Sequence, residues 1–157
     1  MASSRIRVFI IDDSLTIRAM ISTILERHPR IKVVGIAASA EEADVMLQHL
    51  VPDVVLLDIK LPGMNGLQFL RELRRWLDKP IIMLSALMKP GSPERIEAIR
   101  LGAAGAFYKA HILGNSDVLI GMILDAAAGR LNIEMDEMHL PPPVLGGTAT
   151  EMLPSFA

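Results

Sequence analysis

The sequence predicts an α/β fold in which five parallel strands alternate with five helices. Short apolar runs alternate along the chain with longer segments of helical period, which is typical of βαβ units. The apolar runs are rich in Val and Ile and mostly apolar on both faces, as parallel strands covered by helices on both sides should be. The expected strands are residues 5–11, 31–37, 53–57, 80–84 and 105–109.

Start and stop signals place helices between these strands. Ser39, followed three residues later by Glu42, makes a capping box at the start of the second helix. Ser92 and Pro93 are typical of an N-cap followed by proline in the first helical position. Gly102 is placed to end the helix that begins there, because glycine is favoured just after a helix C-terminus.

The last helix and the tail complete the expected organisation. Polar residues 115–117 can cap a helix that runs to about Gly129 or beyond. Residues 4–131 then form one domain. Residues 132–157 hold a proline triplet at 141–143, a Gly-Gly pair and scattered Met and Leu, as expected of a linker or a weakly ordered interaction segment.

Length, composition and charge exclude several classes of protein. The 157 residues, 51% of them hydrophobic, are enough for one domain with a core. No run of about 18 uncharged apolar residues occurs and acids appear early, so a soluble cytoplasmic protein without a membrane segment or signal peptide is expected. The absence of cysteine excludes disulfides, thiolate metal sites and cysteine catalysis. Net charge is +2 over residues 1–131 and −4 over 132–157, and neither segment suggests direct nucleic-acid binding.

Acidic residues follow two of the expected strands, at the sheet edge where open α/β sheets place their binding sites. Asp12 and Asp13 follow the first strand, and Asp58 ends the third. If these strands are neighbours, as in one of the two common doubly wound orders, the three carboxylates converge. Two such charges about 4 Å apart repel by roughly 4 kcal/mol at an effective dielectric constant near 20, so the cluster needs a cation. Oxygen ligands from few side chains suit Mg²⁺, which readily shares its coordination shell with a phosphate.

Two further polar residues follow strands on the same edge, Ser85 after the fourth and Lys109 after the fifth. A lysine can pair with a carboxylate at rest and with a phosphoryl oxygen afterwards, and a hydroxyl donates one neutral hydrogen bond. Asp58 in such surroundings can act as the nucleophile of aspartyl-phosphate chemistry. Each of these residues alone is more often a helix cap, a loop hydroxyl or a solvated strand end. Five of them at the ends of four strands are hard to attribute to chance.

Four motifs together resemble the bacterial response-regulator receiver domain over roughly residues 4–130. They are "IDDS", "LLDIKLPGMNG", "LSA" and "GAAGAFYKA". The resemblance implies a flavodoxin-like sheet of order 2-1-3-4-5 with helices on both faces. It also implies a switch in two-component or chemotaxis-type signalling: a histidine kinase or phosphotransfer protein passes a phosphoryl group to an aspartate, with Mg²⁺ or Mn²⁺ present, and a protein–protein interaction changes.

The resemblance implies a role for each residue of the site. By matching positions, Asp58 is the phosphoacceptor, and Asp12 and Asp13 are the acidic-pocket residues. Ser85 is the switch hydroxyl and Lys109 is the lysine that pairs with the phosphate.

The resemblance further implies metal ligands and partner surfaces. The ligands would be Asp13, Asp58 and the backbone carbonyl of Lys60, with Asp12 acting through water. The family's usual partner or dimer surface is formed by the fourth helix, fifth strand and fifth helix, so a homodimer through that face stays an open expectation. The cognate kinase and the downstream partner cannot be read from the sequence.

Within the family, the segments "DDSLTIRAMI", "HPRIKVVGIA" and "IIMLSAL" look most like the regulatory domain of the chemotaxis protein-glutamate methylesterase. The esterase domain of such proteins, with a serine nucleophile in a glycine-rich turn, has no counterpart here, because "LGGTAT" at 145–150 contains no serine. The chain is therefore expected to be a non-enzymatic switch. It is either a receiver cut from such a protein or a stand-alone relative.

Two positions depart from the family pattern. The aromatic residue whose rotamer usually reports phosphorylation is replaced by Ala106, and the proline that usually follows the lysine is replaced by Ala110. A cis bond before a residue other than proline costs about 2.5–4 kcal/mol, so we expect a trans bond and a rebuilt loop over 110–115. Strand alternation places Phe107 on the opposite face from Ala106, where it is expected to be part of the core.

Other classes of function remain as alternatives. An aspartyl-phosphate phosphatase typically places a second aspartate two residues after the nucleophile, but that residue is Lys60, which favours a phosphoryl group that is held longer. A pseudo-receiver would bind partners without phosphorylation, as the missing aromatic and proline allow. A flavin or nucleotide carrier would need a phosphate-binding loop after the first strand, where this chain has acids.

Overall fold

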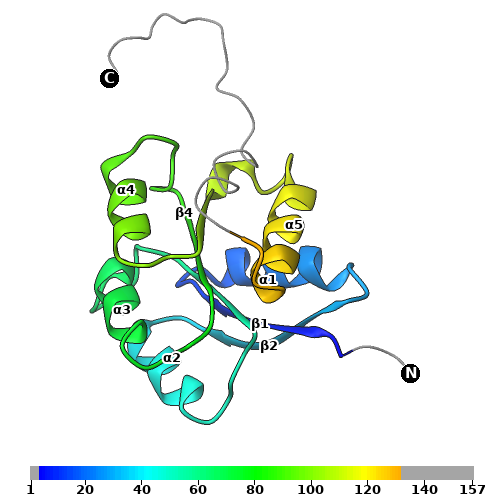
Figure 1. Cartoon of the computed structure of the whole chain (residues 1–157), viewed down its shortest axis with the longest axis horizontal. Helices are drawn as coiled ribbons and strands as arrows, with labels where there is room; N and C mark the ends of the chain where they lie inside the picture. Colours follow the sequence, from blue (N-terminus) through cyan, green and yellow to red (C-terminus); the bar gives the residue numbers. More distant parts are fainter. Residues whose placement is uncertain (1–3, 132–157) are drawn as a thin grey trace, which may run out of the picture.

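Five parallel strands form the central sheet of the molecule (Figure 1), in a computed structural model that describes residues 4–131. The strands are β1 (Ile6–Ile11), β2 (Ile31–Ala37), β3 (Val54–Leu57), β4 (Ile81–Ser85) and β5 (Gly105–Tyr108). Their order across the sheet is β2-β1-β3-β4-β5. The expected fold class and strand order are confirmed, and each strand boundary lies within one residue of its expected place. The expected linker at 132–157 lies outside the described residues.

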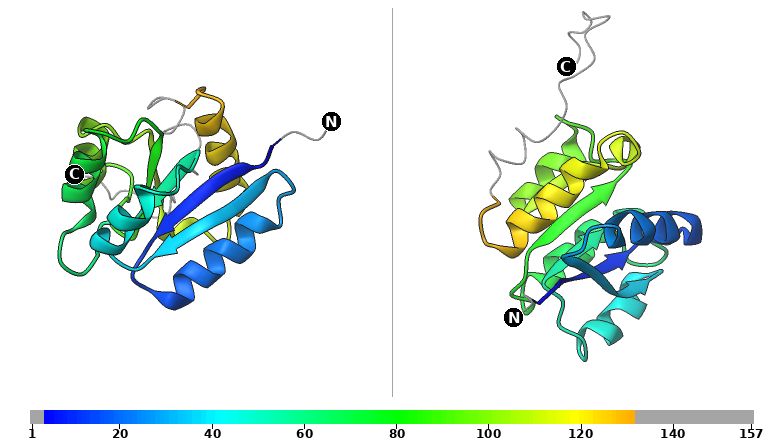
Figure 2. Two further views of the ribbon diagram at one scale, coloured as in Figure 1. Left: turned by 90° about the horizontal axis from the view of Figure 1, so that it is seen from below. Right: turned by 90° about the vertical axis from the view of Figure 1, so that its right-hand side faces the viewer.

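Helices cover both faces of the sheet, as the three views show (Figures 1 and 2). One face carries α1 (Leu15–Glu26) and α5 (Ser116–Ala127). The other face carries α2 (Ala40–Leu47), α3 (Gly66–Leu73) and α4 (Pro93–Arg100). A short 3₁₀ turn, η1 (Lys109–His111), follows β5. Within residues 4–131, no helix combines the length and the apolar character needed to cross a membrane.

The core consists of two layers because neighbouring residues of each strand point to opposite faces. Ile10 and Leu56 pack in the layer under α1 and α5, whereas Phe9 and Val55 pack in the layer under α2, α3 and α4. Complete burial of each such side chain stabilises the fold by roughly 1.5–3 kcal/mol. This alternation explains why the strands are apolar on both faces.

The same alternation separates Ala106 from Phe107 at the end of the sheet. Both residues are completely buried, with Ala106 in the layer under α4 and Phe107 in the layer under α5. The expectation that Phe107 is a core residue is confirmed. No cis peptide bond occurs in the described chain, so the bond after Lys109 is trans as expected, and η1 forms the first part of the loop that follows.

The capping signals of α4 have the expected structure. The Ser92 Oγ accepts a hydrogen bond from the Arg95 N–H at 3.1 Å, and Pro93 occupies the first helical position. Gly102 follows the helix with a φ of 105°, a left-handed conformation that favours glycine.

The capping box expected at α2 is only half formed. The Ser39 Oγ accepts from the Glu42 N–H at 3.1 Å, as expected. The Glu42 carboxylate, however, accepts from the Ala38 N–H at 2.6 Å, because it reaches past the cap residue to the preceding amide. A complete reciprocal box forms instead at the start of α3, between Asn65 and Gln68.

The last helix ends slightly earlier than expected. Its final residue is Ala127, and Gly129 adopts a φ of 74° just beyond it. The Gly129 N–H donates to the Ala126 carbonyl at 3.0 Å and the Arg130 N–H donates to the Asp125 carbonyl at 2.8 Å. These two bonds form a Schellman motif, which satisfies the last carbonyls and stops the helix.

Gly66 places the start of α3 directly against the end of β3. A Cβ atom at this position would lie 1.9 Å from the Asp58 carbonyl oxygen and 2.7 Å from the Ile59 Cα. The Gly66 N–H also donates to the Ile59 carbonyl at 2.7 Å. Both neighbours are backbone atoms, so only a residue without a side chain fits.

We expect Gly66→Ala to lower the free energy of unfolding by about 2–4 kcal/mol, because α3 must move away from the backbone of β3. Gly121→Ala is the matched control, since a Cβ in that turn of α5 would meet nothing within 4 Å. The control should be neutral or gain up to about 1 kcal/mol from helix propensity. Urea unfolding measures both changes. Equal stabilities of the two variants would contradict the close approach at Gly66.

Candidate functional site

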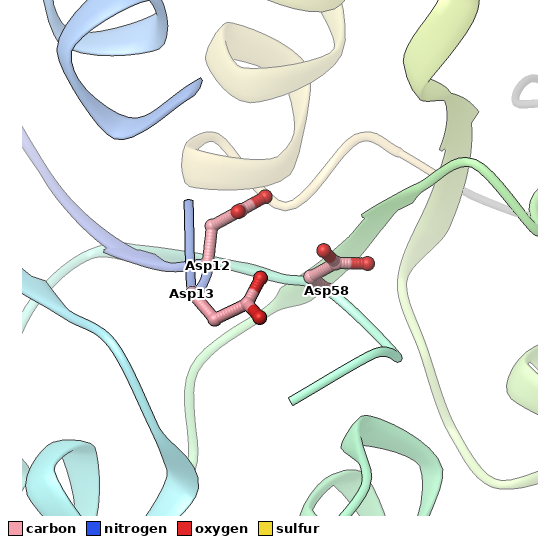
Figure 3. Close-up of side chains that lie close together, drawn as sticks. All are labelled: Asp12, Asp13 and Asp58. Atoms are coloured by element: carbon pink, nitrogen blue, oxygen red, sulfur yellow. The ribbon is translucent and has the colours of Figure 1, made fainter. Parts of the chain in front are cut away.

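Three carboxylates meet at the carboxyl edge of the sheet (Figure 3). Asp12 and Asp13 follow β1, and Asp58 follows β3, its hydrogen-bonded neighbour. One oxygen atom from each of the three side chains lies within 4.8 Å of the others. Asp12 and Asp58 are buried, with 2% and 4% of their surface exposed, whereas Asp13 is exposed. The expected convergence of these acids is therefore observed.

The ammonium of Lys109 lies between the two buried carboxylates. Its Nζ is 2.6 Å from the Asp12 Oδ2 and 2.7 Å from the Asp58 Oδ2. The lysine follows β5, so this contact ties the last strand of the sheet to β1 and β3. Hydrogen bonds between ionised partners are about twice as strong as neutral ones, and these two offset the burial of the charges.

Backbone amides hold the other oxygen of Asp58. Its Oδ1 accepts from the Ile59 N–H at 2.7 Å and lies 3.4 Å from the Lys60 nitrogen, which makes a longer second bond. Its Oδ2 is held by the ammonium of Lys109. The carboxylate thus has hydrogen-bond donors on both oxygens, which restricts its orientation at the end of β3. The backbone of Lys60 lies beside it.

A serine, and neither of the adjacent acids, caps α1. The Ser14 Oγ accepts from the Ile17 N–H at 3.2 Å, while the Asp12 Oδ1 accepts from the Ser14 N–H at 2.9 Å. Asp12 is thereby held at both of its oxygens, and Asp13 is left at the exposed side of the cluster. Helix capping, the common alternative role for such acids, is performed here by Ser14.

Burial and the neighbouring charges shift the protonation of this cluster. Burial raises the pKa of Asp12 above its ordinary value and the nearby charge of Asp58 adds to the increase, although the Lys109 hydrogen bond opposes it. Burial alone would lower the pKa of Lys109, but its hydrogen bonds to Asp12 and Asp58, and their charges, outweigh burial and raise it. The lysine therefore stays protonated.

Ser85 ends β4 on the same edge and is also buried. Its Oγ accepts from the Leu87 N–H at 3.2 Å, and in the sheet it pairs with Tyr108, the residue before Lys109. The structure therefore brings Asp12, Asp13, Asp58 and Lys109 into one cluster and places Ser85 beside it.

The cluster fits a hard divalent cation. Its donors are carboxylate oxygens of three acids, and within residues 4–131 the Lys109 ammonium is paired with two of them, Asp12 and Asp58. Such a surplus of negative charge is relieved by a cation that prefers oxygen ligands. The expected carboxylates of Asp12, Asp13 and Asp58 are thus grouped closely enough to hold such an ion.

One neighbour of the site gave no signal in the sequence. The Arg18 Nη1 donates to the Asp12 carbonyl at 2.7 Å, so the first turns of α1 hold the end of β1 through this side chain. No motif marks an arginine six residues after an aspartate. Its role depends on how α1 packs beside the strand.

The raised pKa of Asp12 predicts how the stability of the fold depends on pH. The folded-state pKa lies above the ordinary value of 3.8, so the unfolded chain ionises first as the pH rises. Ionisation of Asp12 therefore lowers the free energy of unfolding as the pH rises through the folded-state pKa. Asp12→Asn removes this cost, so its stability relative to wild type should increase as the pH rises above the ordinary pKa of 3.8. Urea unfolding in buffer with a chelator measures the difference, and a constant difference would contradict the raised pKa.

Comparisons with known proteins agree with this geometry. A family model described as the response regulator receiver domain matches residues 8–115. The protein-glutamate methylesterase/protein-glutamine glutaminase 2 of Vibrio vulnificus is 38% identical over 119 residues, which are 76% of this chain and 34% of that protein. The chain thus spans about a third of the length of the curated relatives that it matches.

Solved structures share the fold. The response regulator domain of Thermotoga maritima CheB matches with a TM-score of 0.75 and 32% identity, over 79% of this chain and 97% of that domain. A chain of the CheX-CheY-BeF3-Mg complex from Borrelia burgdorferi matches with a TM-score of 0.61 and 25% identity, over 71% and 86% of the two chains. Given the sheet order, the acid cluster and the family match, the chain belongs to the response regulator receiver domain family.

Proposed function

We propose that Asp58 accepts a phosphoryl group and that this event switches an interaction with another protein. The observation that carries the proposal is the setting of Asp58, a nearly buried carboxylate at a strand end whose oxygens face two backbone amides and the Lys109 ammonium. A carboxylate fixed in this way is oriented for attack, since orientation is a large part of the catalysis of phosphoryl transfer. Membership of the receiver family supports the same role.

The proposed donor is a phosphohistidine of a kinase or phosphotransfer protein. An oxygen of Asp58 attacks phosphorus, the O–P bond forms and the P–N bond breaks. The electron pair goes to the imidazole nitrogen, which takes a proton from solvent, and Asp58 becomes an acyl phosphate. Lys109 then donates a hydrogen bond to a phosphoryl oxygen in place of the carboxylate. The Ser85 hydroxyl donates a hydrogen bond to another phosphoryl oxygen.

We further propose that the acid cluster holds Mg²⁺, with Mn²⁺ as a substitute. Asp13, Asp58 and the backbone carbonyl of Lys60 would be the ligands, and Asp12 would act through water. When bound, the cation supplies positive charge beside the incoming phosphoryl oxygens. The exposed position of Asp13 supports its assignment, because it leaves this side of the cluster accessible to an ion and a phosphate.

Residues 4–131 are proposed to act as the signalling unit, and residues 132–157 as a linker. The curated relatives are methylesterase/glutaminase proteins by name, and this chain matches only about a third of their length. We infer that the unit controls a protein partner or a further domain and has no esterase chemistry of its own. The face formed by α4, β5 and α5 is the proposed contact surface, for that partner or for a second copy.

Phosphorylation of Asp58 is tested by incubation with radiolabelled acetyl phosphate or a phosphorylated histidine kinase, with Mg²⁺. Wild type should be labelled and Asp58→Asn should not, because an amide cannot form the acyl phosphate. Asp78→Asn, which removes an exposed carboxylate that precedes β4 at the opposite edge, is the matched control and should be labelled like wild type. Labelling that persists in Asp58→Asn, or is absent from wild type, would instead favour a different acceptor or a pseudo-receiver.

The metal assignment is tested with Asp13→Asn. Loss of one of three like charges should raise the free energy of unfolding in metal-free buffer and weaken Mg²⁺ binding roughly tenfold or more, since affinity depends on the number of charged ligands. Calorimetric titration and urea unfolding, each with and without Mg²⁺, measure the two effects, with Asp78→Asn again as the control. Unchanged Mg²⁺ affinity in Asp13→Asn would remove it from the ligand set.

A further inference from the structure

Three exposed arginines lie together at the amino edge of the sheet, where the strands begin. Arg5 precedes β1, Arg27 follows the last residue of α1, and Arg30 precedes β2. The Ile6 N–H donates to the Arg30 carbonyl at 2.6 Å, so the main chain at Arg5 runs beside the main chain at Arg30. Arg27 and Arg30 belong to the same short connection between α1 and β2. We call Arg5, Arg27 and Arg30 the arginine cluster.

The charge of the arginine cluster is not balanced within residues 4–131, where no carboxylate forms an ion pair with any of its three members. The adjacent acid Glu26 instead accepts from the Val33 N–H at 2.9 Å. The negative end of the α1 dipole favours a cation at Arg27, but Arg5 and Arg30 follow no helix directly. Like charges held close together repel, so a segment of opposite charge would stabilise the cluster.

The described part of the chain ends at the same edge of the sheet. Because α5 begins beyond the carboxyl end of β5 and runs back along the sheet, it ends at the amino edge, where β1 and β2 begin (Figures 1 and 2). Leu131, the last described residue, packs against the core layer that contains Ile6 and Ile24. Ile6 directly follows Arg5, and Ile24 lies three residues before Arg27. The chain therefore leaves the domain near the arginine cluster.

The sequence that follows Leu131 is acidic. Residues 132–137 read "NIEMDE" and supply three carboxylates, those of Glu134, Asp136 and Glu137, without a basic residue. An extended chain spans at most about 3.3–3.6 Å per residue, so these acids can lie up to about 10–20 Å from Leu131. Three acids thus follow the chain exit within reach of three arginines, and the two sets have opposite charge.

We propose that the acidic segment 134–137 of this chain docks on the arginine cluster. One exposed ion pair favours the docked state by a factor of about two, so three pairs favour it about eightfold. The short tether makes the contact intramolecular, which gives the segment a high effective concentration at the cluster. Docking holds the start of the linker at the sheet edge opposite to Asp58. The inference does not depend on phosphorylation of that residue.

Proteolysis of the full chain measures docking. An endoproteinase that cuts after glutamate reaches the bonds after Glu134 and Glu137 only when the segment is undocked, so the rate of cleavage follows the undocked population. At low salt, the variant R27Q/R30Q should be cut there about fourfold faster than wild type, because two of the three arginines are lost. The matched control is R71Q/R75Q, which removes two exposed arginines at the end of α3, at the same sheet edge. It should be cut like wild type, and urea unfolding checks that both variants are folded.

Salt and a change in the acidic segment give two further readouts. About 0.5 M NaCl screens exposed ion pairs, so wild type and R27Q/R30Q should then be cut at equal rates. Asp136→Asn leaves both cleavage sites in place and should speed cleavage about twofold at low salt. Equal low-salt rates for wild type and R27Q/R30Q, or an equal gain in R71Q/R75Q, would overturn the docking. If the rates are equal but a polyglutamate peptide binds wild type more tightly than R27Q/R30Q, the cluster takes an acidic segment of another protein and the proposal is wrong.

Discussion

The contact of the Lys109 ammonium with Asp12 and Asp58 is the interaction on which the site depends. Two carboxylates with almost no solvent access would repel each other at this edge of the sheet without the Lys109 ammonium between them. The contact requires a strand order that places β1 beside β3 and brings β5 to the same edge through β4. The charge balance of the site therefore depends on the strand order of the sheet. The phosphoacceptor chemistry proposed for Asp58 depends on both.

Most of the fold could be predicted from the sequence because the two core layers follow from strand alternation. The convergence of Asp12, Asp13 and Asp58 could be predicted only if the first and third strands were neighbours. Hydrophobic periodicity does not reveal strand order, and the resemblance of the motifs to the receiver family implied it. Local hydrogen-bond choices were harder to predict. The Glu42 carboxylate bonds the Ala38 N–H and leaves the capping box incomplete, because several amides compete within reach at a helix start.

The burial of Arg95 could not be predicted from the sequence. The segment "PERIEAIR" is rich in charged residues, and arginine is almost never completely buried unless it is paired. Its main-chain partner Met88 lies in a loop, where no periodicity indicates which carbonyl faces inward. The substitution at Ala106, in contrast, was visible in the sequence. Local motifs thus locate the residues of the site, whereas the buried contact of α4 with the loop before it is a property of the packed structure.

The long separation between Lys109 and its partners has a consequence for folding. The lysine lies 97 residues after Asp12 and 51 after Asp58, and it follows the last strand to join the sheet along the chain. Contacts between such distant residues form late, since the entropy of closing the intervening chain must first be overcome. During synthesis, the acids emerge from the ribosome long before their lysine. A nascent chain therefore lacks the lysine that contacts Asp12 and Asp58 until its final strand has been made and docked, so the site proposed for phosphorylation is completed last.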